Sequence, residues 1–304
     1  MQPSFWKRTA FDHQDMMMFL QELADEYPFL ALSYLGNSIL GKAIPKIVLG
    51  NGRRKLLYVG THHGMEWITS MILCRFLQDF CENYRQKSRV FRTSIDAIWQ
   101  THTLFVVPML NPDGTDYQIH GVQKENPLYE RVFRMNGGSN DFSHWQANAR
   151  GVDLNHNYDA GFWEYKMLEC EAEIFAGATR YSGEAPESEP EVAALCNFIR
   201  FEENLHGILT LHTQGEEIFY QSNDRCPKNA AAIAKRLSAA SGYRLSTATG
   251  LASYGGLTDW CVQKQGLPAF TLECGKGSNP LPVSDAPSIY ATLRKALFLF
   301  PTWL

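Results

Sequence analysis

The hydrophobic positions of the chain follow two alternating periods. Apolar residues recur at helical spacing over 16–23, 67–84 and 189–198, and short apolar runs stand at 31–34, 55–59, 208–211 and 269–272. The first pattern is typical of amphipathic helices and the second of buried strands. Ser188 and Glu191 have the spacing of a capping box, which predicts a helix start between them. This alternation predicts an α/β fold with a largely parallel or mixed central β-sheet flanked by helices.

The segment GTHHGMEWIT, at residues 60–69, holds the first candidate chemistry. It lies between the predicted strand at 55–59 and the predicted helix at 67–84, so His63 and Glu66 fall on a strand-to-helix turn. Three-residue spacing on one helical turn puts both side chains on the same face, and imidazole with carboxylate suits Zn²⁺. A hydrogen-bonded histidine beside a surface glutamate has the same spacing, so the pair predicts a zinc site only if further ligands follow.

Four later segments supply the remaining parts of such a site. They are VVPMLNPDG (106–114), WQANARGVDLNHNYDAGF (145–162), HGILTLHTQGEEIFY (206–220) and LPAFTLECG (267–275). Together with His63 and Glu66, they resemble the zinc carboxypeptidase family, whose type member is pancreatic carboxypeptidase A. The resemblance runs in order from LGNSILGKAI near residue 40 to Glu273, and it includes YSGEAPESEPEV ahead of the predicted helix at 189–198.

The resemblance implies one zinc ion per chain, held by His63, Glu66 and His212, with Glu273 as the catalytic base. Three protein ligands leave a position for water, and zinc lowers the pKa of that water to about 7. Glu273 follows the strand at 269–272, at the edge where open α/β sheets bind ligands. It would take a proton from the water and pass it to the leaving amine. Because the site spans residues 63 to 273, we expect a single zinc peptidase domain over residues 1–304.

The chain departs from the family pattern where the substrate is held. Met65 stands in place of the arginine inside HxxE, and Asn155 is followed by His156 where the family has arginine. We expect Asn155 and His156 to contact the substrate; the alternative is that His156 only packs in its turn. An arginine that polarises the scissile carbonyl would align between residues 146 and 150, which makes Arg150, or the more distant Arg134, its candidate.

Two further residues have roles that the sequence leaves open. Leu251, in LASYGGLTDW, occupies the position of the family's mobile tyrosine, and Tyr254 follows three residues later. Tyr254 either binds substrate in its place or packs as an aromatic against the Gly-Gly turn. His62 adjoins His63 but matches no ligand position in the family, so we expect it to support the site or to be structural.

The stretch WQANARGVDLN narrows the function that the resemblance implies. It is similar to the WKAN-x-RGVDLN pattern of the bacterial branch that cleaves the γ-D-glutamyl-meso-diaminopimelate bond of cell-wall peptides. We therefore expect a zinc peptidase acting on muropeptides in cell-wall recycling or remodelling. The same chemistry would serve a metallocarboxypeptidase that releases C-terminal amino acids from ordinary peptides. Two less favoured alternatives are a catalytically silent peptide-binding module, against which Glu273 argues, and an N-acyl amino acid amidohydrolase, against which the GVDLNHN segment argues.

Composition limits the partners and the compartment. The net charge is −4 with Lys and Arg scattered, so no basic stripe predicts nucleic-acid binding. No apolar run approaches the length of a membrane span, and the N-terminus lacks a basic region followed by an apolar core. The seven cysteines include no CxxC pair, which favours reduced thiols. We therefore expect a cytoplasmic enzyme without a membrane partner, and no nucleophilic role for Cys274 beside Glu273.

Overall fold

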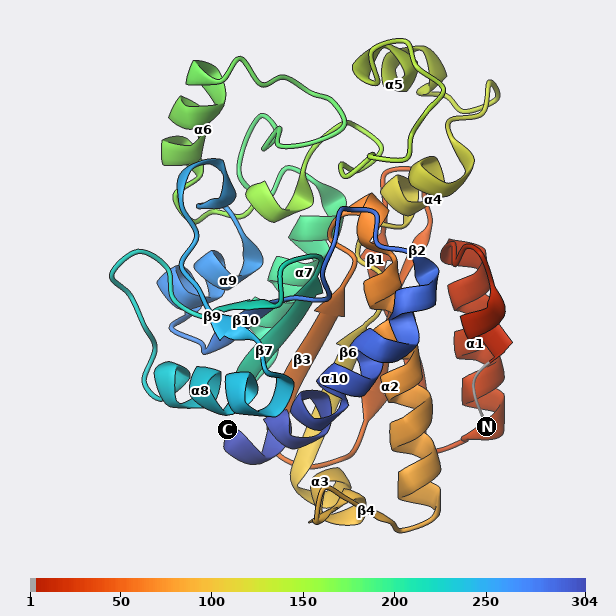
Figure 1. The fold of residues 1–304 in the computed structure, drawn as a ribbon, viewed down its shortest axis with the longest axis vertical. Helices are drawn as coiled ribbons and strands as arrows, with labels where there is room; N and C mark the ends of the chain where they lie inside the picture. The colour runs from red at the N-terminus through yellow and green to blue at the C-terminus, as the bar shows by residue number, and fades with distance from the viewer. Residues whose placement is uncertain (1–3) are drawn as a thin grey trace.

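The computed structural model describes residues 4–304 and has an eight-stranded mixed sheet at its centre (Figure 1). The strand order is β1-β2-β6-β3-β7-β10-β8-β9. The strands are β1 (Ala31–Asn37), β2 (Ala43–Leu49), β3 (Arg54–Gly60), β6 (His102–Val107), β7 (Leu205–His212), β8 (Glu217–Phe219), β9 (Arg244–Leu245) and β10 (Ala269–Glu273). The neighbours β6, β3, β7 and β10 pair in parallel, whereas β2 pairs antiparallel with β1 and β6, and β8 pairs antiparallel with β10. The small strands β4 (Arg89–Val90) and β5 (Thr93–Ser94) form a separate ribbon.

Helices cover both faces of this sheet (Figure 1). They are α1 (His13–Glu26), α2 (Ile68–Arg85), α3 (Ile95–Thr101), α4 (Pro112–His120), α5 (Tyr129–Met135), α6 (Phe162–Glu171), α7 (Pro190–Phe201), α8 (Ala230–Ser241), α9 (Leu257–Trp260) and α10 (Ala286–Leu299). Apolar residues of α1, α2, α3, α8 and α10 form one core with the sheet, and those of α7 and α9 form the other. The predicted α/β architecture is confirmed.

Strand β3 shows why the central strands have continuous apolar runs in the sequence. Leu56 and Tyr58 lie in the core on one face of the sheet, and Leu57 and Val59 lie in the core on the other. Successive side chains of a strand point to opposite faces, so a strand covered on both sides is apolar at every position. The predicted strands at 31–34, 55–59, 208–211 and 269–272 lie within β1, β3, β7 and β10, and the helix predicted at 67–84 is α2.

The predicted capping box before α7 is wrong. Glu189 is the N-cap residue of this helix, and its side chain makes no capping hydrogen bond. The Ser188 hydroxyl donates to the Glu189 carboxylate at 2.9 Å, and the Glu191 carboxylate accepts from the backbone N–H of Ile39 at 3.3 Å. Both side chains that a capping box would use are therefore bound to other groups, Ser188 to its neighbour Glu189 and Glu191 to the distant backbone of Ile39.

The parallel pairing brings three distant segments to one edge of the sheet. Gly60 at the end of β3 pairs with Leu211, and Glu273 at the end of β10 pairs with His212. The loops that follow these strands meet at this edge, below α5 and α6 in Figure 1. Within the described residues, no helix combines the length and the apolar character needed to cross a membrane.

Candidate metal centre and active site

A short turn between β3 and α2 presents the first two candidate ligands. Residues Gly64–Glu66 form a 3₁₀ turn, in which side chains three residues apart eclipse each other. His63 precedes this turn and Glu66 ends it, so both side chains face the same way. The turn begins after Thr61, whose φ of 53° is left-handed and whose backbone N–H donates to the Thr69 hydroxyl at 2.9 Å.

Close backbone contacts explain the glycines of the neighbouring motifs. A Cβ at Gly64 would lie 2.4 Å from the carbonyl of Gly114, and a Cβ at Gly114 would lie 2.2 Å from the carbonyl oxygen of Ala147. The Asn111 amide donates to the carbonyl oxygens of His62 and Ala147, at 3.0 and 3.2 Å. The HHGME, NPDG and WQANAR segments are therefore stacked backbone against backbone, which holds the ligand turn in place.

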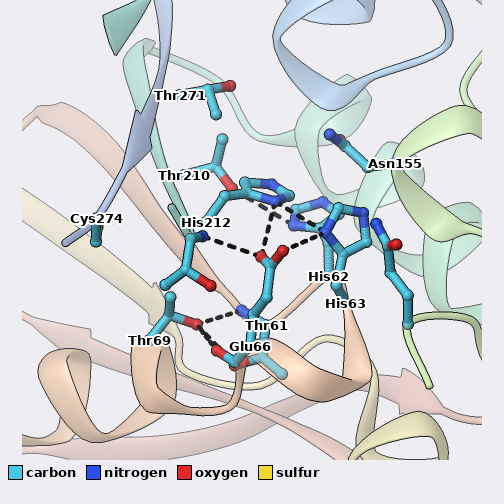
Figure 2. Close-up of polar contacts among 12 residues, drawn as sticks. Thr61, His62, His63, Glu66, Thr69, Asn155, Thr210, His212, Thr271 and Cys274 are labelled. Carbon is cyan, nitrogen blue, oxygen red and sulfur yellow. Dashed lines mark hydrogen bonds and ion pairs between the residues drawn. The ribbon is translucent and has the colours of Figure 1, made fainter. Parts of the chain in front are cut away.

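His63, Glu66 and His212 converge on one point (Figure 2). The Nδ1 atom of His63 lies 3.0 Å from one Glu66 oxygen, and the Nδ1 atom of His212 lies 3.3 Å from the other. The two Nδ1 atoms are 3.3 Å apart. All three side chains are buried, and one ligand atom from each lies within 4.8 Å of the others.

Further hydrogen bonds orient these side chains. The Nε2 atom of His63 lies 3.0 Å from Asp153 Oδ1, which leaves Nδ1 to face Glu66. Glu66 accepts from the backbone N–H of Thr213 at 3.1 Å and from the Asn279 amide at 3.3 Å. A carboxylate behind a histidine ligand sets its tautomer and orientation, as in many zinc sites.

The charges and lone pairs of these side chains favour a divalent cation between them. With Nε2–H donating to Asp153, a neutral His63 would direct its Nδ1 lone pair at the Glu66 carboxylate, and two acceptors at 3.0 Å repel unless a cation lies between them. Burial would lower the pKa of His63, but the negative charges of Glu66 and Asp153 raise it well above its usual range. The carboxylates that favour a proton here also favour a metal ion, and two imidazoles with a carboxylate are a zinc ligand set. Within residues 4–304, this trio is the one such group of candidate ligands.

Glu273 lies beside these ligands at the end of β10. It lines a cavity of about 560 Å³ together with His63 and Glu66. Burial, with the negative charge of Glu66, raises the pKa of Glu273 to about 8 in the metal-free chain. A carboxyl group with a raised pKa that faces a cavity is suited to proton transfer. The neighbouring Cys274 is fully buried, lies apart from the ligands in Figure 2, and has its thiol pKa raised by burial, so it does not present a nucleophile.

Asn155 and His156 line the same cavity. The Asn155 side-chain oxygen accepts from the backbone N–H of Leu257 at 3.2 Å. The His156 ring stacks on Tyr165 with centroids 4.0 Å apart, and its Nδ1 atom lies 2.9 Å from the carbonyl oxygen of Tyr254. A carbonyl only accepts, so Nδ1 carries the proton. Burial lowers the pKa of His156, which leaves a neutral ring with an accepting Nε2 atom.

The other candidate substrate-binding residues lie elsewhere. The Arg150 guanidinium donates to Glu189 at 3.1 Å, and Arg150 is not among the residues lining the cavity. Arg134 is exposed on α5 and donates to the carbonyl oxygen of Glu130. Tyr254 has a left-handed backbone and packs against Gly161, where a Cβ would lie 2.5 Å from the tyrosine ring. Tyr254 therefore packs against Gly161, a contact other than the predicted one with the Gly-Gly turn at 255–256.

His62 turns away from the ligands toward the protein interior. Its Nε2 atom lies 2.9 Å from the Tyr158 hydroxyl, and its ring stacks on His212 with centroids 5.1 Å apart. Burial and the nearby histidines lower its pKa well below the usual value. A neutral, hydrogen-bonded His62 therefore supports the ring of a candidate ligand.

Sequence reasoning missed several residues that line the cavity. They include Gln146, Asp153, Arg180 and Asn279. Gln146 is the second residue of the WQANAR segment, in which only arginines were considered as carbonyl-polarising groups. Arg180 directly precedes YSGEAPESEPEV, so its place beside a recognised segment was the available signal.

A smaller cavity adjoins the first at Glu273. Its volume is about 110 Å³, and Glu273 and Asn155 line both cavities. The hydroxyls of Thr258 and Thr271 lie 2.7 Å apart in its wall. The remaining lining residues are Phe219, Gln221, Ala248, Ala252, Gly256 and Asp259. The wall is therefore mostly polar and includes two carboxyl groups, those of Asp259 and Glu273.

Comparison with known proteins gives consistent matches over most of the chain. The family described as zinc carboxypeptidase matches residues 16–296. Gamma-D-glutamyl-L-diamino acid endopeptidase 1 of Lysinibacillus sphaericus is 34% identical over 290 residues, which cover 95% of this chain and 71% of that protein. Bovine thrombin-activatable fibrinolysis inhibitor has a TM-score of 0.74 at 19% identity, over 98% of each chain. Carboxypeptidase A of Helicoverpa armigera has a TM-score of 0.70 at 19% identity, over 98% of this chain and 74% of its own. At such identities the two structures support the fold alone.

Proposed function

Because the chain belongs to the zinc carboxypeptidase family, we propose that it hydrolyses the γ-D-glutamyl-meso-diaminopimelate amide bond of cell-wall muropeptides. The proposed hydrolysis rests on one observation, that His63, Glu66 and His212 converge beside Glu273 at one cavity. Zinc held by the first three residues would act as a Lewis acid and lower the pKa of water to about 7.

The remaining chemistry belongs to side chains of this chain. We assign to Glu273 the proton transfers, in which its carboxylate accepts a proton from the attacking water and returns it to the leaving amine. Gln146 accepts a hydrogen bond from Thr179, which leaves its amide N–H groups to orient the scissile carbonyl oxygen. Asp153 holds the His63 ring in the tautomer that directs Nδ1 at the metal position.

Two observations support the finer substrate assignment. The relative named as a γ-D-glutamyl-L-diamino acid endopeptidase matches 95% of this chain. The small cavity at Glu273 is lined by the hydroxyls of Thr258 and Thr271 and by the Asp259 carboxyl group. Such a wall suits a side chain that carries amine and carboxylate groups better than an apolar one.

We also propose that the reaction takes place in the cytoplasm, during recycling of muropeptides. All seven cysteines are free, and five of them are buried. Reduced thiols without a disulfide are usual in a reducing compartment. Fractionation of cells that express the tagged protein would test this part separately from the chemistry.

The activity is tested by mass spectrometry of products from the zinc-loaded protein. The substrates are L-Ala-γ-D-Glu-meso-diaminopimelate and ordinary peptides ending in Phe, Arg or Glu, with the Glu273→Gln protein as the blank. We expect free meso-diaminopimelate from the first substrate and slower or no release from the others. Release from the ordinary peptides alone would favour the general carboxypeptidase, and no release by a zinc-containing protein would favour the silent module.

A further inference from the structure

The cavity at the metal centre has an uneven distribution of charge. Glu66, Asp153 and Glu273 contribute three carboxyl groups to its wall. Among its lining residues, which all lie in the described part of the chain, Arg180 is the one lysine or arginine. We propose that Arg180 pairs with a carboxylate of the substrate and thereby selects acidic peptides, an inference that rests on the proposed hydrolytic function.

The backbone of Arg180 is held from both sides. Its N–H donates to Asp153 Oδ2 at 3.2 Å, and its carbonyl oxygen accepts from the Tyr165 hydroxyl at 2.8 Å. Its φ of 67° is in the left-handed region, which a residue with a long side chain seldom adopts. Such strain persists only where surrounding contacts impose it, and it is concentrated at binding and active sites. Asp153 also contacts His63, so one carboxylate fixes both the ligand ring and the backbone of the arginine.

The guanidinium group of Arg180 is available to a ligand. Its side chain is exposed at the cavity, and no described carboxylate lies within ion-pair distance of it. By contrast, Arg150 pairs with Glu189 at 3.1 Å, and Arg294 pairs with Asp79 at 2.6 Å. The planar donor fork of an arginine matches a carboxylate through two parallel hydrogen bonds. An unpaired arginine held at the reaction cavity is therefore positioned for this kind of recognition.

No other polar side chain of the cavity wall offers a permanent positive charge. Gln146, Asn155 and Asn279 are neutral amides, and Met65 is apolar. His156 uses Nδ1 on the carbonyl oxygen of Tyr254. A substrate carboxylate in this cavity has the metal ion and Arg180 as its cationic partners.

Three carboxylates of the proposed substrate have this chemistry. One is the carboxylate of the diamino acid on the carbon that bears the leaving nitrogen, and another is the carboxylate at the far end of its side chain. The third is the α-carboxylate of the γ-linked glutamyl residue, on the carbon three positions from the scissile carbonyl. Converting each to its amide in turn removes one charge and leaves the scissile bond unchanged.

The test combines these amides with variants of Arg180. Arg180→Gln and Arg180→Lys are compared with Arg53→Gln, which alters an exposed arginine directly before β3, at the opposite edge of the sheet from the cavity. We expect Arg180→Gln to raise KM about ten- to hundredfold on the unmodified tripeptide, because one charge-assisted hydrogen-bonded pair is lost. Its kcat and zinc content should stay near those of the wild type. Arg180→Lys should restore part of the loss. The amide substrate that is insensitive to Arg180→Gln identifies the carboxylate concerned.

Two results would overturn the assignment. One is equal KM values for Arg180→Gln and Arg53→Gln. The other is an equal loss on the tripeptide and on all three amides, which indicates a structural role. If the wild-type protein cleaves only ordinary peptides, the proposed muropeptide substrate fails, and the same comparison uses those peptides and their C-terminal amides. If the wild-type protein cleaves none of these peptides, the affinity of each variant for the tripeptide is measured by calorimetry. Equal affinities of the wild type and Arg180→Gln would contradict the proposal.

Discussion

Glu191 should make the stability of this protein depend on pH. Its side chain is fully buried at the start of α7, where it accepts from the backbone of Ile39 at 3.3 Å and from the Asn148 amide at 3.5 Å. Burial raises the pKa of Glu191 from 4.5 to about 7, and the negative charges of Asp113 and Glu189 act in the same direction. Ionisation of Glu191 is therefore less favourable in the folded protein than in the unfolded chain.

The size and sign of the effect follow from proton linkage. A pKa raised from 4.5 to about 7 corresponds to about 3 kcal/mol, at about 1.4 kcal/mol for each tenfold change in proton affinity. Between these two pH values the folded state binds more protons than the unfolded state, so the free energy of unfolding falls as pH rises. The stabilisation is complete below pH 4.5 and is lost above about pH 7.

The assay is urea unfolding of the wild-type and Glu191→Gln proteins across this pH range, with a chelator present so that metal binding does not contribute. We expect the stability of Glu191→Gln, relative to wild type, to rise by about 3 kcal/mol from pH 4.5 to about pH 8. Any fixed cost of placing the new amide against Asn148 shifts this difference by a constant and leaves its slope unchanged. The exposed Glu203→Gln controls for the loss of one carboxyl group. A difference that stays constant with pH would refute the reasoning.

Three further predictions concern the metal centre. The wild-type protein should bind one zinc ion per chain by elemental analysis, and His212→Ala should lose it, so full retention in that variant would exclude the site. Asp153→Asn should weaken zinc affinity about ten- to hundredfold in a chelator competition, because it alters the partner of His63 Nε2; an unchanged affinity would count against that role. Glu273→Gln should keep zinc and the fold but lose about a hundredfold or more in kcat, and near-normal turnover would move the base elsewhere.

The parts of the site predicted from sequence are those fixed by periodicity and strand order. His63 and Glu66 follow an apolar strand and precede an amphipathic helix, so their common face could be predicted. His212 and Glu273 end parallel strands, and parallel strands end at one edge of a sheet. Local pattern was sufficient there because the backbone itself positions the side chains.

The parts that sequence could not predict depend on loop paths and competing partners. Arg150 was a reasonable candidate from its segment, but the buried Glu189 carboxylate holds its guanidinium away from the cavity. Arg180 lies between α6 and α7, where no hydrophobic period indicates which way a side chain points. Ser188 and Glu191 had the spacing of a helix cap, yet the Asn157 amide donates to the Ser188 hydroxyl and the Glu191 carboxylate accepts from the Ile39 backbone. In each case a contact distant in sequence decided the geometry.

Asp153 connects the metal centre to the proposed recognition of the substrate. Its Oδ1 atom faces His63 Nε2 and accepts from the backbone of Asn155 at 3.1 Å, while Oδ2 accepts from the backbone of Arg180. A full negative charge on Asp153 strengthens all three hydrogen bonds, and its pKa is held well below the usual range by the charge of His63 and by these bonds, despite burial. The GVDLN segment therefore places one carboxylate where a metal ligand, a cavity-lining amide and the one cavity-lining arginine are held together. A cavity that must align an acidic peptide with a metal-bound nucleophile requires such common positioning, because misplacement by about 1 Å can cost about a hundredfold in rate.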